Sequence, residues 1–80
     1  MSKYPIVDVQ KTGIKIKNLC KRKGISVKEI QEYMGLACFQ TIYNWHSGKS
    51  LPSIDNLIVL SRLLNRSIDS ILYIREVEVD

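Results

Sequence analysis

The chain contains at residues 26–48 the stretch SVKEIQEYMGLACFQTIYNWHSG, whose pattern predicts two short helices joined by a tight turn. Ser26, followed three residues later by Glu29, forms a capping box, which marks the start of a helix. Gly35 can take the left-handed conformation that ends this helix. A second helix then extends from about Phe39 to Ser47, so the stretch predicts a helix-turn-helix.

The second of these helices has two chemically different faces at about 100° per residue. One arc of about 120° holds the apolar and aromatic residues Phe39, Ile42, Trp45 and His46. The opposite side holds Gln40, Asn44 and Ser47, flanked by Thr41 and Tyr43. We therefore expect Ile42 and Trp45 to anchor the helix in the core. Its polar outer face has the layout of a helix that enters the DNA major groove, although any solvated surface helix shares that polarity.

Three more helices are predicted around this pair. Thr12 can cap a first helix that runs to Lys23 and stops at Gly24. Pro52 and a capping Ser53 open a fourth helix, which Asn65 can end. Its expected core residues are Ile54, Leu57, Ile58, Leu60, Ser61 and Leu64. Ser67 caps a short fifth helix from Ile68 to about Tyr73, and in the second helix Ile30, Tyr33 and Met34 repeat at helical spacing. The fold class is therefore all-α with five helices.

The two ends of the chain leave two alternatives open. Residues 6–9 and 77–79 alternate apolar with acidic or branched residues, so they can pair as a short antiparallel patch or stay loosely ordered. The chain has no internal repeat, linker or low-complexity tract. We therefore expect one domain over residues 1–80, with its core at about 12–73.

Composition limits the classes of function. Eighty residues enclose a small core but no deep substrate cleft, so an enzyme is not expected. No apolar run approaches the roughly 18 residues that cross a bilayer, and Pro5 and Asp8 interrupt any secretory signal, so we expect a cytoplasmic protein. The net charge of +4 favours a polyanionic partner without requiring one. Cys20 and Cys38 are then expected to be reduced thiols.

These motifs together resemble the Xre and Cro/C1-type helix-turn-helix family of bacterial and phage regulators. The resemblance covers about Thr12 to Leu72 and rests on residues 24–26, Gly35, Ile42, Trp45, residues 48–53, Asn56, Leu57 and Leu60. In detail the chain is similar to short stand-alone bacterial members. The resemblance implies a lambda-repressor-like fold, Leu57 as a further core anchor, and a sequence-specific, usually dimeric DNA-binding regulator.

The resemblance also implies a role for individual residues. Gln40, Thr41 and Asn44, with Phe39 beside them, occupy the positions that read base edges. Contacts to the DNA backbone fall on Ser26, Val27, Lys28, Tyr43, Ser47, Lys49 and Ser50. These roles suit the residue types, because Gln and Asn amides match the donor and acceptor pattern of adenine. Free backbone N–H groups at the start of the second helix favour a phosphate.

The chain departs from the family pattern at three positions. Many members place a Gln where this chain has Val27, so Lys28 and the backbone would have to replace that phosphate contact. Many members also pair an Arg with a Glu at the positions of Cys20 and His46. Replacing both members of a buried ion pair can be nearly neutral, whereas losing one costs roughly 3–5 kcal/mol. We therefore expect Cys20 and His46 to approach each other in the core.

Other classes of function have weaker support in the sequence. A protein-interaction module of the same fold, such as an antitoxin-like or anti-repressor partner, is the main alternative. Cys20 and His46 give two ligands where zinc needs three or four, and Cys38 would complete a set only if all three converge, so no metal or cofactor is expected. The expected partners are double-stranded DNA and a second copy of the chain. The apolar residues Tyr73, Ile74, Val77 and Val79, with the fifth helix, are the candidate dimer surface.

Overall fold

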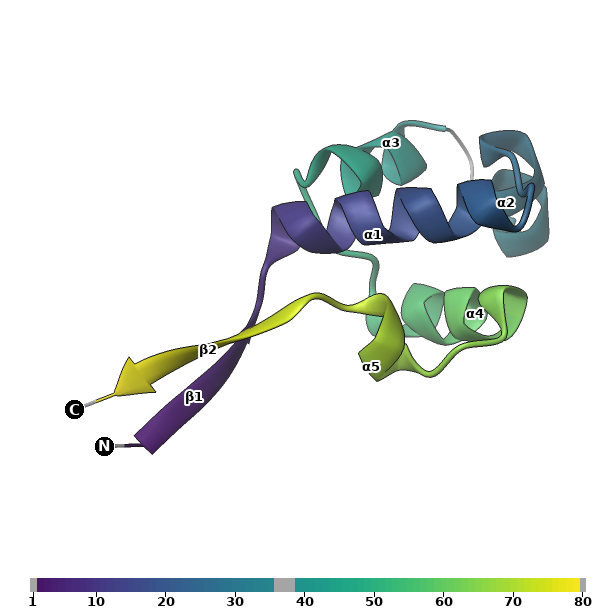
Figure 1. Ribbon diagram of the computed structural model, residues 1–80. Coiled ribbons are helices and arrows are strands. Elements are labelled where there is room, and N and C mark those ends of the chain that lie inside the picture. The colour runs from purple at the N-terminus through teal and green to yellow at the C-terminus, as the bar shows by residue number, and fades with distance from the viewer. Residues whose placement is uncertain (1, 36–38, 80) are drawn as a thin grey trace.

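Five helices lie between two terminal strands in the computed structural model, which describes residues 2–35 and 39–79. The helices pack into a bundle, and the strands form a ribbon that projects away from it (Figure 1). The elements in chain order are β1 (Ser2–Val7), α1 (Val9–Arg22), α2 (Val27–Met34), α3 (Gln40–Ser47), α4 (Ile54–Leu64), α5 (Ile68–Ile71) and β2 (Ile74–Val79).

The core takes a fully buried aliphatic side chain from every helix. These residues, all with an exposed fraction of 0%, are Ile16, Ile30, Ile42, Leu60 and Ile71. Trp45, Leu19, Cys20 and Leu64 complete the central cluster, while the predicted anchor Leu57 is buried at 9% exposure outside it. The predicted all-α class with five helices is confirmed. Within the described residues no helix is long and apolar enough to span a membrane.

Most helix ends follow the predicted signals. Ser26 and Glu29 form the capping box of α2 with both of its reciprocal hydrogen bonds. Gly35, Gly48 and Asn65 end α2, α3 and α4 in the left-handed conformation. The Ser53 and Ser67 side chains accept backbone hydrogen bonds at the starts of α4 and α5. Local capping chemistry therefore fixes where these helices begin and end.

The predicted start of α1 is wrong. Asp8, not Thr12, caps the helix, because its side chain accepts a hydrogen bond of 2.9 Å from the Lys11 amide. Thr12 is instead fully buried in the first turns, where its hydroxyl accepts a hydrogen bond of 2.9 Å from the Tyr73 amide. A Thr hydroxyl can cap a helix or accept a hydrogen bond from a distant amide. Because Tyr73 is 61 residues away, the local sequence around Thr12 does not reveal this partner.

Two apolar residues of α4 predicted for the core lie at the surface instead, and Tyr33 of α2 is exposed as well. Tyr33 is 59% exposed on α2, and Ile54 and Ile58 are 75% and 40% exposed on α4. The buried stripe of α4 is centred between Leu57 and Leu60, and at about 100° per residue Ile54 and Ile58 fall roughly 90° or more away from it. Short helices in a small bundle bury a narrower face than apolar spacing alone suggests.

The terminal segments pair as an antiparallel ribbon, so the paired alternative is correct and both strands are longer than expected. The register sets Ser2 opposite Val79 and Val7 opposite Ile74. Val9, predicted within the first strand, belongs to α1. The fifth helix ends at Ile71, two residues early, because the chain must extend at Leu72 to enter β2.

α1 and α3 come into backbone contact at Gly13. A Cβ at this position would overlap the carbonyl oxygen of Trp45 and lie 3.1 Å from that of His46. No side chain fits between the two helices there. The helices can approach this closely because residue 13 is a glycine.

We therefore predict that Gly13→Ala destabilises the fold. Ala in place of Gly in a helix normally gains about 1 kcal/mol, but overlap with the α3 backbone should reverse the sign and cost about 1–3 kcal/mol. Urea unfolding followed by circular dichroism measures the change. The control is Asn18→Ala, an exposed site on the same helix, where Ala should be neutral or slightly stabilising. Equal or greater stability of the Gly13 variant would contradict the packing.

Candidate nucleic-acid interface

α3 has an apolar inner face and a polar outer face, as predicted. Ile42 and Trp45 are 0% and 2% exposed and pack in the central cluster. Gln40 and Ser47 are exposed and Asn44 is partly exposed on the other side. Because the indole is buried, it holds the helix against the bundle and is unavailable to stack on a base. The polar side chains face outward from a rigid support.

The two amides on the outer face of α3 are linked to each other. The Gln40 side-chain nitrogen Nε2 donates a hydrogen bond of 2.9 Å to Oδ1 of Asn44, one turn further along the helix. This bond leaves the Gln40 carbonyl oxygen and the Asn44 amide N–H groups free to face outward. The pair therefore presents one acceptor and one donor in a fixed arrangement.

The other predicted base-reading residues differ in exposure. Phe39 occupies the cap position before α3, lacks a side-chain capping bond and is 43% exposed. Thr41 is only partly exposed, on the side of the helix nearer Trp45. Tyr43, predicted for the DNA backbone, is 51% exposed. Phe39 and Tyr43 thus offer aromatic surface to a ligand, while Thr41 offers less.

The loop after α3 is held by one carbonyl group. The Asn44 carbonyl oxygen accepts hydrogen bonds from the Lys49 amide at 2.9 Å and from the Ser50 amide at 3.3 Å. The Ser47 hydroxyl donates to the same oxygen at 3.4 Å. This arrangement fixes the exposed Lys49 and Ser50 beside the outer face of α3. Hydrogen bonds to the Asn44 backbone therefore link the residues predicted to contact bases with Lys49 and Ser50, which are predicted to contact the DNA backbone.

The start of α2 offers fewer free amides than predicted. Within the capping box, the Ser26 amide donates to the Glu29 carboxylate at 3.3 Å, and the Glu29 amide donates to the Ser26 hydroxyl at 3.1 Å. Ser26 is thus engaged within the protein. The amides of Val27 and Lys28, which lack an acceptor one turn earlier, are the remaining donors for an anion.

Two adjoining pockets connect the start of α2 with α3. A cavity of about 380 Å³ reaches from Ser26 and Val27 to Tyr43 and His46, and one of about 330 Å³ reaches from Tyr43 and His46 to Gln40, Ser47 and Lys49. Lys17 of α1 lines both of them. Among the described lining residues none is acidic, so this surface has a positive potential suited to a phosphate backbone.

Lys17 and Lys21 of α1 also line these pockets, and Lys17 had no role predicted from the sequence. At about 100° per residue they lie about 40° and 80° from Gly13, the point where α1 touches α3. The signal was their spacing of four residues on α1. This spacing does not show which face of α1 adjoins α3. The contact at Gly13 in the structure identifies that face.

Cys20 and His46 both line the larger of these two pockets, where Cys20 is buried in the core and His46 is partly exposed. Cys20 is 3% exposed, and burial raises the pKa of its thiol. Burial, and then the charge of Lys17, lower the pKa of His46. Its Nε2 atom is buried without a hydrogen-bond partner among the described residues. Burial thus disfavours the charged form of both side chains.

No metal site is formed by the described residues, where no group of three or more His, Cys, Asp or Glu side chains converges. Cys38, the third possible ligand, lies outside the described residues.

Comparisons with known proteins identify the fold independently. A family model described as helix-turn-helix matches residues 16–71. The chain is similar to the restriction-modification controller protein C.AhdI from Aeromonas hydrophila, with 22% identity, a TM-score of 0.70, and coverage of 80% of this chain and 96% of that one. It is also similar to the DNA-binding domain of BldD, with 15% identity, a TM-score of 0.68, and coverage of 82% and 94%. At sequence identities this low, the similarity to these two structures shows a shared fold and no more. No curated protein matches the chain.

We predict that stability falls as the pH is lowered from 7.5 to 5. The unfolded chain binds a proton at His46 near the ordinary pKa of 6.5, whereas folded His46 has a lower pKa and resists protonation. The stabilisation is therefore complete above about pH 6.5 and is lost progressively below it. Urea unfolding at a series of pH values measures this slope.

The matched variant for this experiment is His46→Gln. His46 is the only histidine of the chain, so no second imidazole contributes to the slope near pH 6.5. The variant should lose most of the change in stability between pH 7.5 and pH 6. An unchanged slope in the variant would show that His46 is not responsible.

Proposed function

Because the chain belongs to the Cro/C1-type helix-turn-helix family, we propose that it is a sequence-specific DNA-binding transcriptional regulator that acts as a repressor. In this proposal α3 enters the major groove, which is wide enough to admit a helix. The observation that carries it is the outward-facing amide pair of Gln40 and Asn44 on a helix whose opposite side is fixed by buried Trp45.

The amide pair suits adenine as a single reading unit. Adenine presents its N6 amino donor and N7 acceptor side by side in the major groove. The free carbonyl oxygen of Gln40 can accept from N6, and the free N–H of Asn44 can donate to N7. Their mutual hydrogen bond of 2.9 Å holds both groups ready before DNA arrives, which lowers the entropy lost on binding. Phe39 and Thr41 would add contacts to base methyl groups.

Contacts to the phosphate backbone would surround this reading unit. Lys49 and Ser50 lie on one side of α3, held by the Asn44 carbonyl. Lys17 lines one cavity with Lys49 and another with Val27 at the start of α2, where Lys28 follows in the same turn. Such contacts position a protein on the duplex without reading its sequence.

We predict different effects from the two kinds of contact. Gln40→Ala and Asn44→Ala should each cost about 1–3 kcal/mol of binding on cognate DNA and relax the preference at one base position. The double variant should cost less than the sum, because each single change already disrupts the shared unit. Lys49→Ala should weaken binding to cognate and random DNA alike and reduce the salt slope by about one. Fluorescence anisotropy on both duplexes measures these effects.

The same titrations distinguish DNA from a protein partner. Binding through several phosphates weakens log-linearly as salt rises, whereas a mainly apolar protein contact does not. Equal losses on cognate and random DNA for all three variants would contradict the assigned roles. Binding that is weak and independent of salt would favour the protein-interaction module.

We further propose that the regulator acts as a homodimer through its terminal ribbon. Residues directly opposite in an antiparallel pair point to the same face, so one face carries Tyr4 opposite Val77 and Ser2 opposite Val79, with Ile6 opposite Arg75 at the end of the ribbon nearest the helices. The other face carries Lys3 opposite Glu78 and Pro5 opposite Glu76. A lone two-stranded ribbon is marginally stable in water. A two-fold axis would set the apolar face against itself and leave the charges in water.

The dimer would bind two half-sites about one helical turn, roughly 34 Å, apart. We predict that replacing both Val77 and Val79 with Ser shifts the protein to monomer in sedimentation equilibrium. The control replaces Glu76 and Glu78, which lie on the opposite face, and should associate like the parent protein. A monomeric parent, or a valine variant that associates normally, would exclude this surface.

A further inference from the structure

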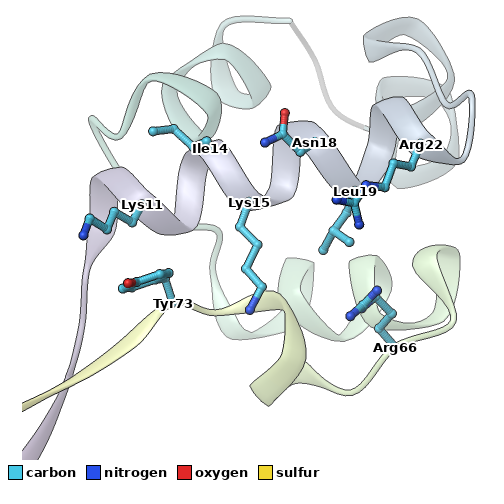
Figure 2. A pocket seen from close by; sticks show the side chains of 8 residues that line it. All are labelled: Lys11, Ile14, Lys15, Asn18, Leu19, Arg22, Arg66 and Tyr73. Atoms are coloured by element: carbon cyan, nitrogen blue, oxygen red, sulfur yellow. The ribbon is translucent and has the colours of Figure 1, made fainter.

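A second basic site lies on the side of α1 that faces away from α3. It is a cavity of about 410 Å³ between α1, the segment after α4, and the residue that precedes β2. Figure 2 shows its eight lining side chains, with Lys15 reaching down from α1 and Arg66 pointing up from below. The volume is within the range of pockets that hold small organic molecules.

This cavity is separate from the proposed DNA surface. At about 100° per residue, Lys11, Lys15 and Arg22 lie roughly 160–200° from Gly13, where α1 touches α3. A helix with its side chains is about 10 Å across, so these cations lie on the far side of α1 from the outer face of α3. A duplex bound to α3 therefore does not explain why they cluster here.

The cavity concentrates positive charge without neutralising it. Lys11, Lys15, Arg22 and Arg66 line it, and none of its described lining residues is acidic. Three of these cations have neutral partners. Lys15 donates to the Leu72 carbonyl at 3.1 Å, Lys11 lies 4.9 Å from the Tyr73 ring centre, and Arg66 donates to the Ser70 hydroxyl at 3.3 Å. The like charges repel one another, and an anion between them would relieve that repulsion.

Apolar surface lies between the charges. Ile14, 56% exposed, and Tyr73, 39% exposed, stand at one end of the cavity, and buried Leu19 lies toward Arg22 and Arg66. These two arginines also line a smaller adjoining cavity of about 90 Å³. Guanidinium groups bind carboxylate or phosphate oxygens in pairs. One end of the site is thus suited to an anionic group and the other to an apolar or aromatic body.

We propose that this cavity binds a small organic anion, with one phosphate or carboxylate group on an apolar or aromatic body. The anionic group lies between Arg22 and Arg66, Asn18 and Lys15 donate to polar atoms along the middle, and the body covers Ile14 and the edge of Tyr73. Because the cavity lies away from the proposed DNA surface, anion binding here can be tested separately from the function proposed above.

The test is a titration of the free, isotope-labelled protein followed by nuclear magnetic resonance, without DNA. The probes are phenyl phosphate, phenylacetate, inorganic phosphate and a tetraglutamate peptide. Phenyl phosphate or phenylacetate should shift the side-chain N–H signals of Arg22 and Arg66 and the ring signals of Tyr73. The tighter of the two identifies the anionic group, and it should bind at least about tenfold more tightly than inorganic phosphate.

Variants locate the site. Arg22→Gln and Arg66→Gln should each weaken the better probe by about tenfold, as expected for a lost charged hydrogen bond. Lys3→Gln and Arg62→Gln remove the same charge outside this cavity and outside the proposed DNA surface, and they should leave the affinity unchanged. Equal weakening by all four variants would indicate general charge attraction and overturn the proposal. So would inorganic phosphate binding as tightly as the organic probes, tetraglutamate binding more tightly than both, or no binding at all.

Discussion

The close contact between α1 and α3 at Gly13 determines which side of α3 faces the core and which side faces solvent. Because no side chain separates the helices there, α3 lies directly on α1, with Ile42 and Trp45 turned into the core. The polar side of α3 must then face outward. The loop after α3 is ordered by the Asn44 carbonyl oxygen, which accepts hydrogen bonds from the amides of Lys49 and Ser50. The contact at Gly13 thus orients the outer face of α3, and the Asn44 carbonyl orders the loop beside it.

α1 also divides the positive charge of the chain between two surfaces. Lys17 and Lys21 lie on the side that adjoins α2 and α3, whereas Lys11, Lys15 and Arg22 line the cavity on the far side. The net charge of +4 is therefore an incomplete description, because the distribution of the charges determines which anion each surface attracts. Tyr73 also lines the far cavity, and its backbone accepts a hydrogen bond from the Asp8 amide and donates one to the Thr12 hydroxyl.

Features determined by short-range chemistry could be predicted from the sequence, and features determined by distant partners could not. The capping box of Ser26, the left-handed residues that end three helices, and the two faces of α3 all depend on neighbours within a few residues. Thr12 was misassigned because its partner is Tyr73. The predicted burial of Ile54 and Ile58 was wrong because the width of a buried helix face depends on the neighbouring helices. The Gln40 to Asn44 bond and the position of Lys17 required coordinates, since residue types alone do not give side-chain direction.

If α3 reads base edges from a rigid support, the protein will select particular sequences from a random duplex pool. After several rounds of binding and sequencing, the account predicts an enriched palindrome with adenine at the same position in each half. The centres of its halves should lie about one helical turn apart. Recovered sequences that match the starting pool, with no enriched position, would contradict the account.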